Sequence, residues 1–138
     1  MGFTTSFRMG QLLQYDFSPP AHPENKSDMA YMVTDFVDAV RKSFSSAGYL
    51  AKNSSSQESG GSWLIGYNKK LYRVDHDFQI GISALGYQSV GCGCDLALGA
   101  LYATKDVIED PKERILTALK AAAQFSGGVR SPFTILSQ

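Results

Sequence analysis

Hydrophobic side chains recur every three or four positions along several segments, the spacing of one helical face. The longest such segment follows Ser27 and runs to about Ala47. Ser27 is a suitable N-cap, Asp28 suits the positive end of the helix dipole, and Gly48 is placed to end the helix. The residues expected on the buried face are Met29, Met32, Val33, Phe36, Val37, Val40 and Phe44. We interpret this stripe as core packing.

Three shorter helices are expected elsewhere. Arg8–Phe17 has the same spacing and is stopped by Ser18-Pro19-Pro20, and Asp95–Lys105 consists mainly of small and aliphatic residues. Asp110, Pro111 and Glu113 form a helix start, with an Asp N-cap and Pro at the first helical position. That last helix should end at Gly127-Gly128. Its expected inward face comprises Ile115, Leu116, Leu119, Ala122, Ala123 and either Phe125 or Ser126.

Aromatic and β-branched residues indicate strands between these helices. Ser62–Tyr67 and Lys70–Val74 should form a hairpin with Asn68-Lys69 as its turn. Further strands are expected over Met1–Ser6, Phe78–Ile82, Tyr87–Val90 and Pro132–Leu136, and a mobile surface loop over Asn53–Gly61. Paired helices on either side of a run of antiparallel strands favour an α+β fold with helices layered over sheet.

Composition narrows the function classes. The chain has 138 residues and 15.0 kDa, the size of one domain spanning residues 1–138. Thirteen basic residues balance thirteen acidic ones, which argues against a nucleic-acid partner or a polybasic membrane surface. Apolar runs are shorter than the roughly 20 residues that span a bilayer. Residues 1–10 do not have the pattern of a signal peptide, so we expect a cytoplasmic protein.

The candidate chemistry in the sequence is sparse. Cys92 and Cys94, with only His22 and His76 elsewhere, make a poor zinc site, because zinc needs four well-placed ligands. Asp75-His76-Asp77 is better explained as a polar loop between strands than as a catalytic triplet, since neighbours in an extended chain point apart.

Gly91-Cys92-Gly93 is a turn leading into a helix. It lacks the spacing of a dinucleotide-binding loop, and it is better suited to deliver backbone N–H groups and a small side chain to a site. Cys92 at this helix N-terminus is a candidate nucleophile, although the sequence places no histidine beside it.

The order of these segments resembles a proteasome β-type subunit, with the bacterial HslV-type peptidases and their phage-borne relatives most similar. The resemblance rests on Gly86–Gly93, the small-residue helix Asp95–Thr104, the helix Glu113–Phe125 followed by Ser126-Gly127-Gly128, and Gly2–Ser6 before a helix. It implies a four-layer αββα N-terminal-nucleophile (Ntn) hydrolase sandwich. It also implies hydrolysis of peptide bonds in peptides or unfolded proteins by an N-terminal Thr, a homo-oligomeric ring, and an ATP-dependent unfoldase as partner.

By this resemblance, the accessory site residues are Gly2 through its backbone N–H, Cys92, Gly93 and Ser126. Cys92 stands where the family usually has Ser. The resemblance implies no organic cofactor, but a monovalent cation held by the backbone carbonyls of Ala123, Ser126 and Val129. Ala123 stands where proteasome subunits carry Asp.

The catalytic Thr and its Asp and Lys are missing if Gly2 matches the family's internal glycine, because Thr4 and Thr5 follow that glycine. The sandwich would then lack its N-terminal strand hairpin, and we expect the chain as given to be inactive. Three explanations are open. The chain is a fragment of a longer enzyme or one whose start codon is wrongly assigned, or it is a shortened, inactive relative kept for assembly. In the third, a neighbouring chain supplies the missing strands.

Two alternatives remain open at this point. One is a non-catalytic structural or assembly subunit of a ring-shaped or phage-related complex. The weaker one is a Cys92-dependent amidohydrolase.

Overall fold

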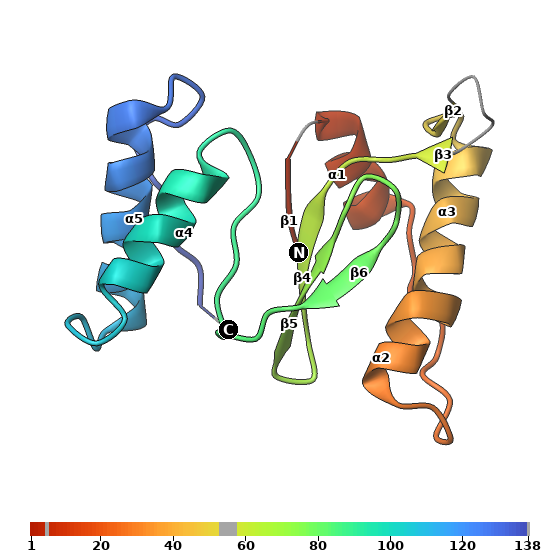
Figure 1. Cartoon of the computed structure of the whole chain (residues 1–138). Helices are drawn as coiled ribbons and strands as arrows, with labels where there is room; N and C mark the ends of the chain where they lie inside the picture. Colours follow the sequence, from red (N-terminus) through yellow and green to blue (C-terminus); the bar gives the residue numbers. More distant parts are fainter. Residues whose placement is uncertain (5, 53–57, 138) are drawn as a thin grey trace. The chain divides into compact units, whose positions relative to one another are not determined.

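A computed structural model describes residues 1–4, 6–52 and 58–137 (Figure 1). The chain divides into two compact units, Met1–Gly86 and Tyr87–Gln138. The expectation of one domain over residues 1–138 stays a prediction. The described elements combine helices with a four-stranded antiparallel sheet, which agrees with the α+β class expected from the sequence.

The first unit is built on a sheet of β1 (Gly2–Phe3), β4 (Trp63–Tyr67), β5 (Lys70–Val74) and β6 (Ile80–Ile82), in the order β1-β4-β5-β6. All neighbouring strands are antiparallel. In the central hairpin Trp63 pairs with Val74 and Tyr67 with Lys70. Asn68 and Lys69 join these strands with φ of 46° and 61°, the left-handed backbone that suits a two-residue hairpin turn. The predicted hairpin is confirmed.

Helices cover one face of this sheet. The first is α1 (Phe7–Tyr15), and the second is a continuous run of α2 (Asp28–Tyr31), a π-helical stretch η1 (Met32–Phe36) and α3 (Val37–Ser46). Ser27 caps this run by accepting a hydrogen bond from the N–H of Ala30, and Gly48 follows its end with φ of 65°. Both predicted helices are confirmed, whereas the hydrophobic spacing did not predict the π-helical stretch.

The core of this unit lies between the helices and one sheet face. Trp63 and Ile65 of β4 are buried, while Leu64 between them is half-buried, so alternate side chains face the helices. Phe44 of α3 meets Trp63 edge to face at 5.9 Å between ring centroids. The most deeply buried large side chains are Trp63, Tyr72, Phe44, Met9, Met32, Val40 and Val74. Val33, expected on the buried helix face, is exposed.

Two segments between α3 and β4 form an additional strand pair, β2 (Ala51–Lys52) with β3 (Glu58–Ser59). β3 lies within Asn53–Gly61, where the sequence predicted only loop, whereas β2 lies just before that stretch. Residues 53–57 of that predicted loop lie outside the described residues.

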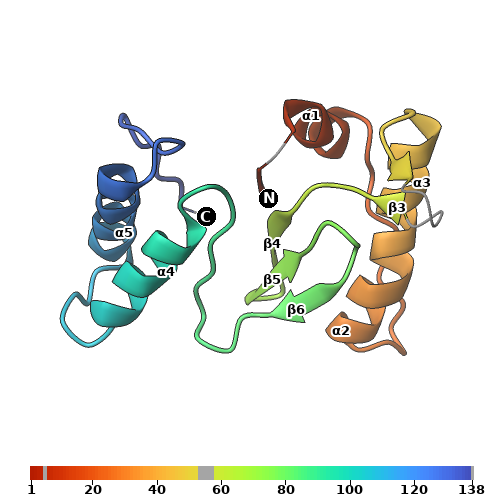
Figure 2. The same cartoon turned by 45° about the horizontal axis from the view of Figure 1, so that its top comes forward.

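The second unit pairs α4 (Cys94–Ala103) with α5 (Pro111–Phe125), as Figure 2 also shows. Asp110 caps α5 by accepting hydrogen bonds from the N–H groups of Lys112 and Glu113, as predicted. The contact is made by small and aliphatic residues: Ala97, Leu101, Ala118 and Ala122.

Three expectations for this unit are wrong. No strand forms over Tyr87–Val90 or Pro132–Leu136, because a strand requires a hydrogen-bonding neighbour and residues 87–137 provide none. Ile115 and Phe125 are 42% and 76% exposed rather than inward-facing. The buried residues of α5 are Ala118, which was not predicted to face inward, and Ala122, which was. No helix among the described residues is long and apolar enough to cross a membrane.

Candidate functional site

The turn before α4 is the first part of the candidate site. The N–H of Cys94 donates to the carbonyl of Gly91 at 3.1 Å, and Gly91 adopts φ of 111°, which favours glycine. The carbonyl of Gly93 accepts the N–H of Ala97 in the first helical turn. These bonds fix the path of the backbone and leave the Cys92 side chain exposed.

The turn after α5 is the second part. The N–H of Ser126 donates to the carbonyl of Ala122 at 2.8 Å, ending the helix. The Ser126 hydroxyl oxygen accepts the N–H of Gly128 at 3.4 Å, and the Ser126 carbonyl accepts the N–H of Val129 at 3.3 Å. Ser126 therefore organises this turn through both its side chain and its backbone.

The two turns pack directly against each other. A Cβ atom at Gly128 would lie 2.8 Å from Cβ and 3.0 Å from Sγ of Cys92, and 3.9 Å from Oγ of Ser126. A Cβ atom at Gly93 would lie 2.7 Å from Cγ2 of Val129 and 2.9 Å from Cβ of Ala122. Contacts this close exclude any side chain at either glycine without movement of its neighbours. The structure thus brings together three of the predicted site residues, Cys92, Gly93 and Ser126.

Gly2 and the early threonines belong to the first unit. Gly2 pairs with Leu64 at the edge of the sheet, and the N–H of Thr4 donates to the carbonyl of Ser62 at 3.2 Å. Thr5 lies outside the described residues. Gly2, the predicted backbone donor, therefore belongs to a different unit from Cys92, Gly93 and Ser126.

A concavity of about 570 Å³ lies beside the second turn and includes Ala123, Ser126 and Val129, the residues expected to hold a cation. They fit a cation poorly. The carbonyl of Ser126 already accepts the N–H of Val129, and the Arg130 side chain, a permanent positive charge, lines the same concavity. Among the described residues, no three His, Cys, Asp or Glu side chains cluster as metal ligands either.

Asp75-His76-Asp77 forms the polar turn that the sequence predicted between β5 and β6. Asp75 accepts a hydrogen bond from Nε of Arg73 at 2.8 Å, and Asp77 accepts the N–H of Gln79 at 3.1 Å. His76 is exposed. The two carboxylates have separate partners and do not converge on the histidine.

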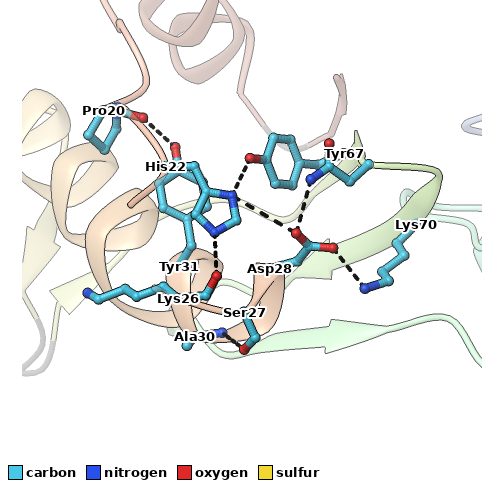
Figure 3. Close-up of polar contacts among 10 residues, drawn as sticks. Pro20, His22, Lys26, Ser27, Asp28, Ala30, Tyr31, Tyr67 and Lys70 are labelled. Carbon is cyan, nitrogen blue, oxygen red and sulfur yellow. Dashed lines mark hydrogen bonds and ion pairs between the residues drawn. The ribbon is translucent and has the colours of Figure 1, made fainter. Parts of the chain in front are cut away.

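The sequence analysis missed a polar cluster around His22 in the first unit (Figure 3). One ring nitrogen, Nε2, lies 2.9 Å from the carbonyl of Lys26, and the other, Nδ1, lies 2.7 Å from the hydroxyl of Tyr67. Because a carbonyl only accepts, Nε2 carries the hydrogen and Nδ1 accepts the O–H of Tyr67 in the neutral ring. The Tyr31 ring stacks on His22 at 4.5 Å, and its O–H donates to the carbonyl of Pro20.

Asp28 extends this cluster to the hairpin turn. Its carboxylate accepts hydrogen bonds from Lys70 at 2.8 Å and Asn68 at 3.0 Å, and lies 4.0 Å from Nδ1 of His22. The hydrogen bonds from Lys70 and Asn68 lower the pKa of Asp28, while burial raises the pKa of Tyr31. Both ring nitrogens of His22 are engaged within the chain, so the cluster anchors the loop after α1 to the hairpin. No local motif identifies it, because its partners are as many as 45 positions apart.

Comparison of the chain with models of protein families, with curated proteins and with solved structures finds no match.

Proposed function

We propose that this chain is a proteasome β/HslV-like domain that carries the accessory side of a threonine-type peptidase site. The observation that supports it is the packing of Cys92 against Gly128, beside Ser126. These residues come from two of the segments on which the resemblance rests, and an accessory site built from both requires them to meet. The proposal includes the four-layer αββα sandwich, a homo-oligomeric ring and an ATP-dependent unfoldase as partner.

The chemistry follows from what each group can do. An N-terminal Thr hydroxyl would attack the peptide carbonyl, and its own α-amine would take the proton, directly or through water. The Ser126 hydroxyl oxygen accepts from Gly128, so its hydrogen stays available to donate to that amine. Cys92 and Gly93 would shape the space beside the nucleophile. The assignment of the oxyanion donor to the N–H of Gly2 rests on the resemblance alone.

The test compares this chain with a form extended upstream in frame, using fluorogenic peptides. We expect no hydrolysis by the chain alone. We expect hydrolysis by an extended form that exposes an N-terminal Thr, and its loss with an inhibitor directed at that Thr. Replacing Ser126 with Ala in the extended form should lower kcat, whereas Ser131→Ala, in the same concavity, is the matched control. Inhibitor-sensitive hydrolysis by the chain alone would overturn the placement of Gly2.

A non-catalytic assembly subunit is the second candidate, and one observation favours it. The helix α4 is almost entirely apolar, and Leu96 and Tyr102 are exposed on it although Ala97 and Leu101 are buried against α5. An exposed apolar helix face is typical of a surface that another protein covers. A defined oligomer by analytical ultracentrifugation, with an extended form that remains inactive, would favour this candidate. Cys92-dependent hydrolysis has less support, since residues 87–138 contain no histidine.

A further inference from the structure

Two thiols stand one residue apart on the turn before α4. Cys92 is exposed, and the half-buried Cys94 donates a thiol hydrogen bond to Oδ1 of Asp95 at 3.4 Å. Gly93 between them has φ of −104° and ψ of 16°. A backbone bent in this way places the flanking Cα atoms about 5–6 Å apart, within the window of about 4.4–6.8 Å that a disulfide spans.

We propose that Cys92 and Cys94 form a reversible redox pair that closes to a disulfide within one chain. This proposal is independent of the proposed peptidase function. The oxidant is a linear low-molecular-weight disulfide such as oxidised glutathione. The exposed Cys92 is the first thiol to react, and Cys94 is the resolving thiol. A disulfide that closes so small a ring at the surface is readily reduced again, which makes the change reversible.

The exchange takes two balanced steps. The Cys92 thiolate, having lost its proton to solvent, attacks one sulfur of the oxidant, forming a mixed disulfide and releasing the first thiolate. The Cys94 thiolate then attacks Sγ of Cys92, which forms the Cys92–Cys94 bond and releases the second thiolate. The released thiolates take up the two protons. The chain loses two electrons and two protons, and the small disulfide is reduced to two thiols.

Formation of the Cys92–Cys94 disulfide should alter the contact between the two turns. In the reduced chain Sγ of Cys92 lies against Gly128, and the backbone of Gly93 lies beside Val129 and Ala122. Bonding to Cys94 requires the Cys92 side chain and the backbone at Gly93 to move, which takes Sγ of Cys92 away from Gly128. The turn of Ser126–Gly128 then loses a packing partner, and its backbone should open more often.

The first test is alkylation of the purified chain after equilibration in glutathione buffers of graded potential, read by intact mass. The reduced chain takes two alkyl groups, and we expect the oxidised monomer to take none, at a midpoint that does not change with protein concentration. With oxidised glutathione as the oxidant, Cys94→Ser should stop at the mixed disulfide, whereas the wild-type chain should not accumulate it. Disulfide-linked dimers as the main product, or equal accumulation of mixed disulfide in both chains, would overturn the proposal.

The second test reads the coupling to the opposite turn. Amide hydrogen exchange at residues 126–129 should be faster in the oxidised chain than in the reduced chain. The double variant Cys92→Ser with Cys94→Ser should show no such difference between the two buffers. A disulfide that forms without any change at residues 126–129 would refute the coupling.

Discussion

At the scale of single residues, the contact between the two turns of the second unit depends on the absence of side chains. Gly93 leaves space for Val129 and Ala122, and Gly128 leaves space for Cys92. Close approach thus explains Gly93 and Gly128, and a left-handed backbone explains Gly91, whereas Gly127 has no atom near its missing Cβ. Gly99, inside α4, has no atom near its missing Cβ and serves as an internal comparison.

Gly93→Ala should lower the free energy of unfolding by about 1–3 kcal/mol, because the new methyl overlaps Val129 and Ala122. Gly99→Ala should raise it by about 0.5–1 kcal/mol, since Ala favours a helix and nothing obstructs it there. Urea denaturation of both variants is the measurement. Equal effects in the same direction would contradict the close packing of the turns.

Two tyrosines of the first unit offer a second matched comparison. The Tyr67 hydroxyl donates to His22, whereas the Tyr72 hydroxyl is buried without a hydrogen-bond partner among the described residues. Tyr67→Phe should lower the free energy of unfolding by about 0.5–1.5 kcal/mol. Tyr72→Phe should leave it unchanged or raise it by up to about 1 kcal/mol, because a desolvated hydroxyl is removed. Thermal denaturation of the two variants checks the order, and a reversed order would refute it.

The ionisation of Asp28 should make the free energy of unfolding depend on pH. The hydrogen bonds from Lys70 and Asn68 lower its pKa in the folded chain below the unfolded value of about 3.9. Its contribution to stability is therefore full above the unfolded pKa and is lost as the pH falls through the folded pKa. Asp28→Asn should flatten the loss of stability below about pH 4, and Lys70→Gln should do the same by removing the main cause. Urea midpoints between neutral and strongly acidic pH test this, and an unchanged slope in both variants would disprove it.

At the scale of elements, the sequence predicted those parts whose signal is local. The caps of Ser27 and Asp110 and the hairpin turn at Asn68-Lys69 depend on neighbours within a few positions, and all three formed. The strands expected over Tyr87–Val90 and Pro132–Leu136 did not, because strand composition does not supply a pairing partner. On α5, the expected burial of Ala122 is confirmed, but the unpredicted Ala118 meets α4 and the larger Ile115 is exposed.

The candidate site divides in the same way. The turn at Gly91–Gly93 was visible as a local pattern, but its contact with Ser126 was implied only by the resemblance. The cluster of His22, Asp28 and Tyr67 gave no signal, since residue types so common, at such separations, have no recognisable spacing.

Asp110 and Ser6, the residues that precede α5 and α1, provide a matched comparison of helix N-termini. Asp110 accepts two N–H groups of α5, while Ser6 precedes α1 without a side-chain hydrogen bond to it. Asp110→Ala should lower the free energy of unfolding by about 0.5–2 kcal/mol. Ser6→Ala should change it by less than about 0.5 kcal/mol. Circular dichroism melting of both variants is the check, and a larger loss for Ser6→Ala would contradict the capping geometry.

At the scale of the whole molecule, the two units differ in how much apolar surface they bury. The core of Met1–Gly86 contains large side chains such as Trp63, Phe44 and Met32, whereas the core of the second unit consists of three alanines and Leu101. Since burial of apolar area is the main stabilising contribution, the first unit should be the more resistant to opening.

Native-state hydrogen exchange should therefore divide the chain at about Gly86. We expect amides of β4 and β5 to exchange only by the largest opening of the first unit, and amides of α4 and α5 to exchange by an opening of lower free energy. Mass spectrometry of peptides from a denaturant series resolves the two classes. A single common exchange free energy for β5 and α5 would show that the units open together.

The π-helical stretch of Met32–Phe36 has a consequence for the length of the chain. A π turn holds one residue more than an α turn, and here it carries Val33 outward while Met32 and Phe36 on either side stay in the core. Removal of Val33 would let the same core residues return to a regular α-helix. Related chains can thus differ by one residue at this point and still superpose before and after it, so an alignment gap here would mark a change of helical pitch and not a change of fold.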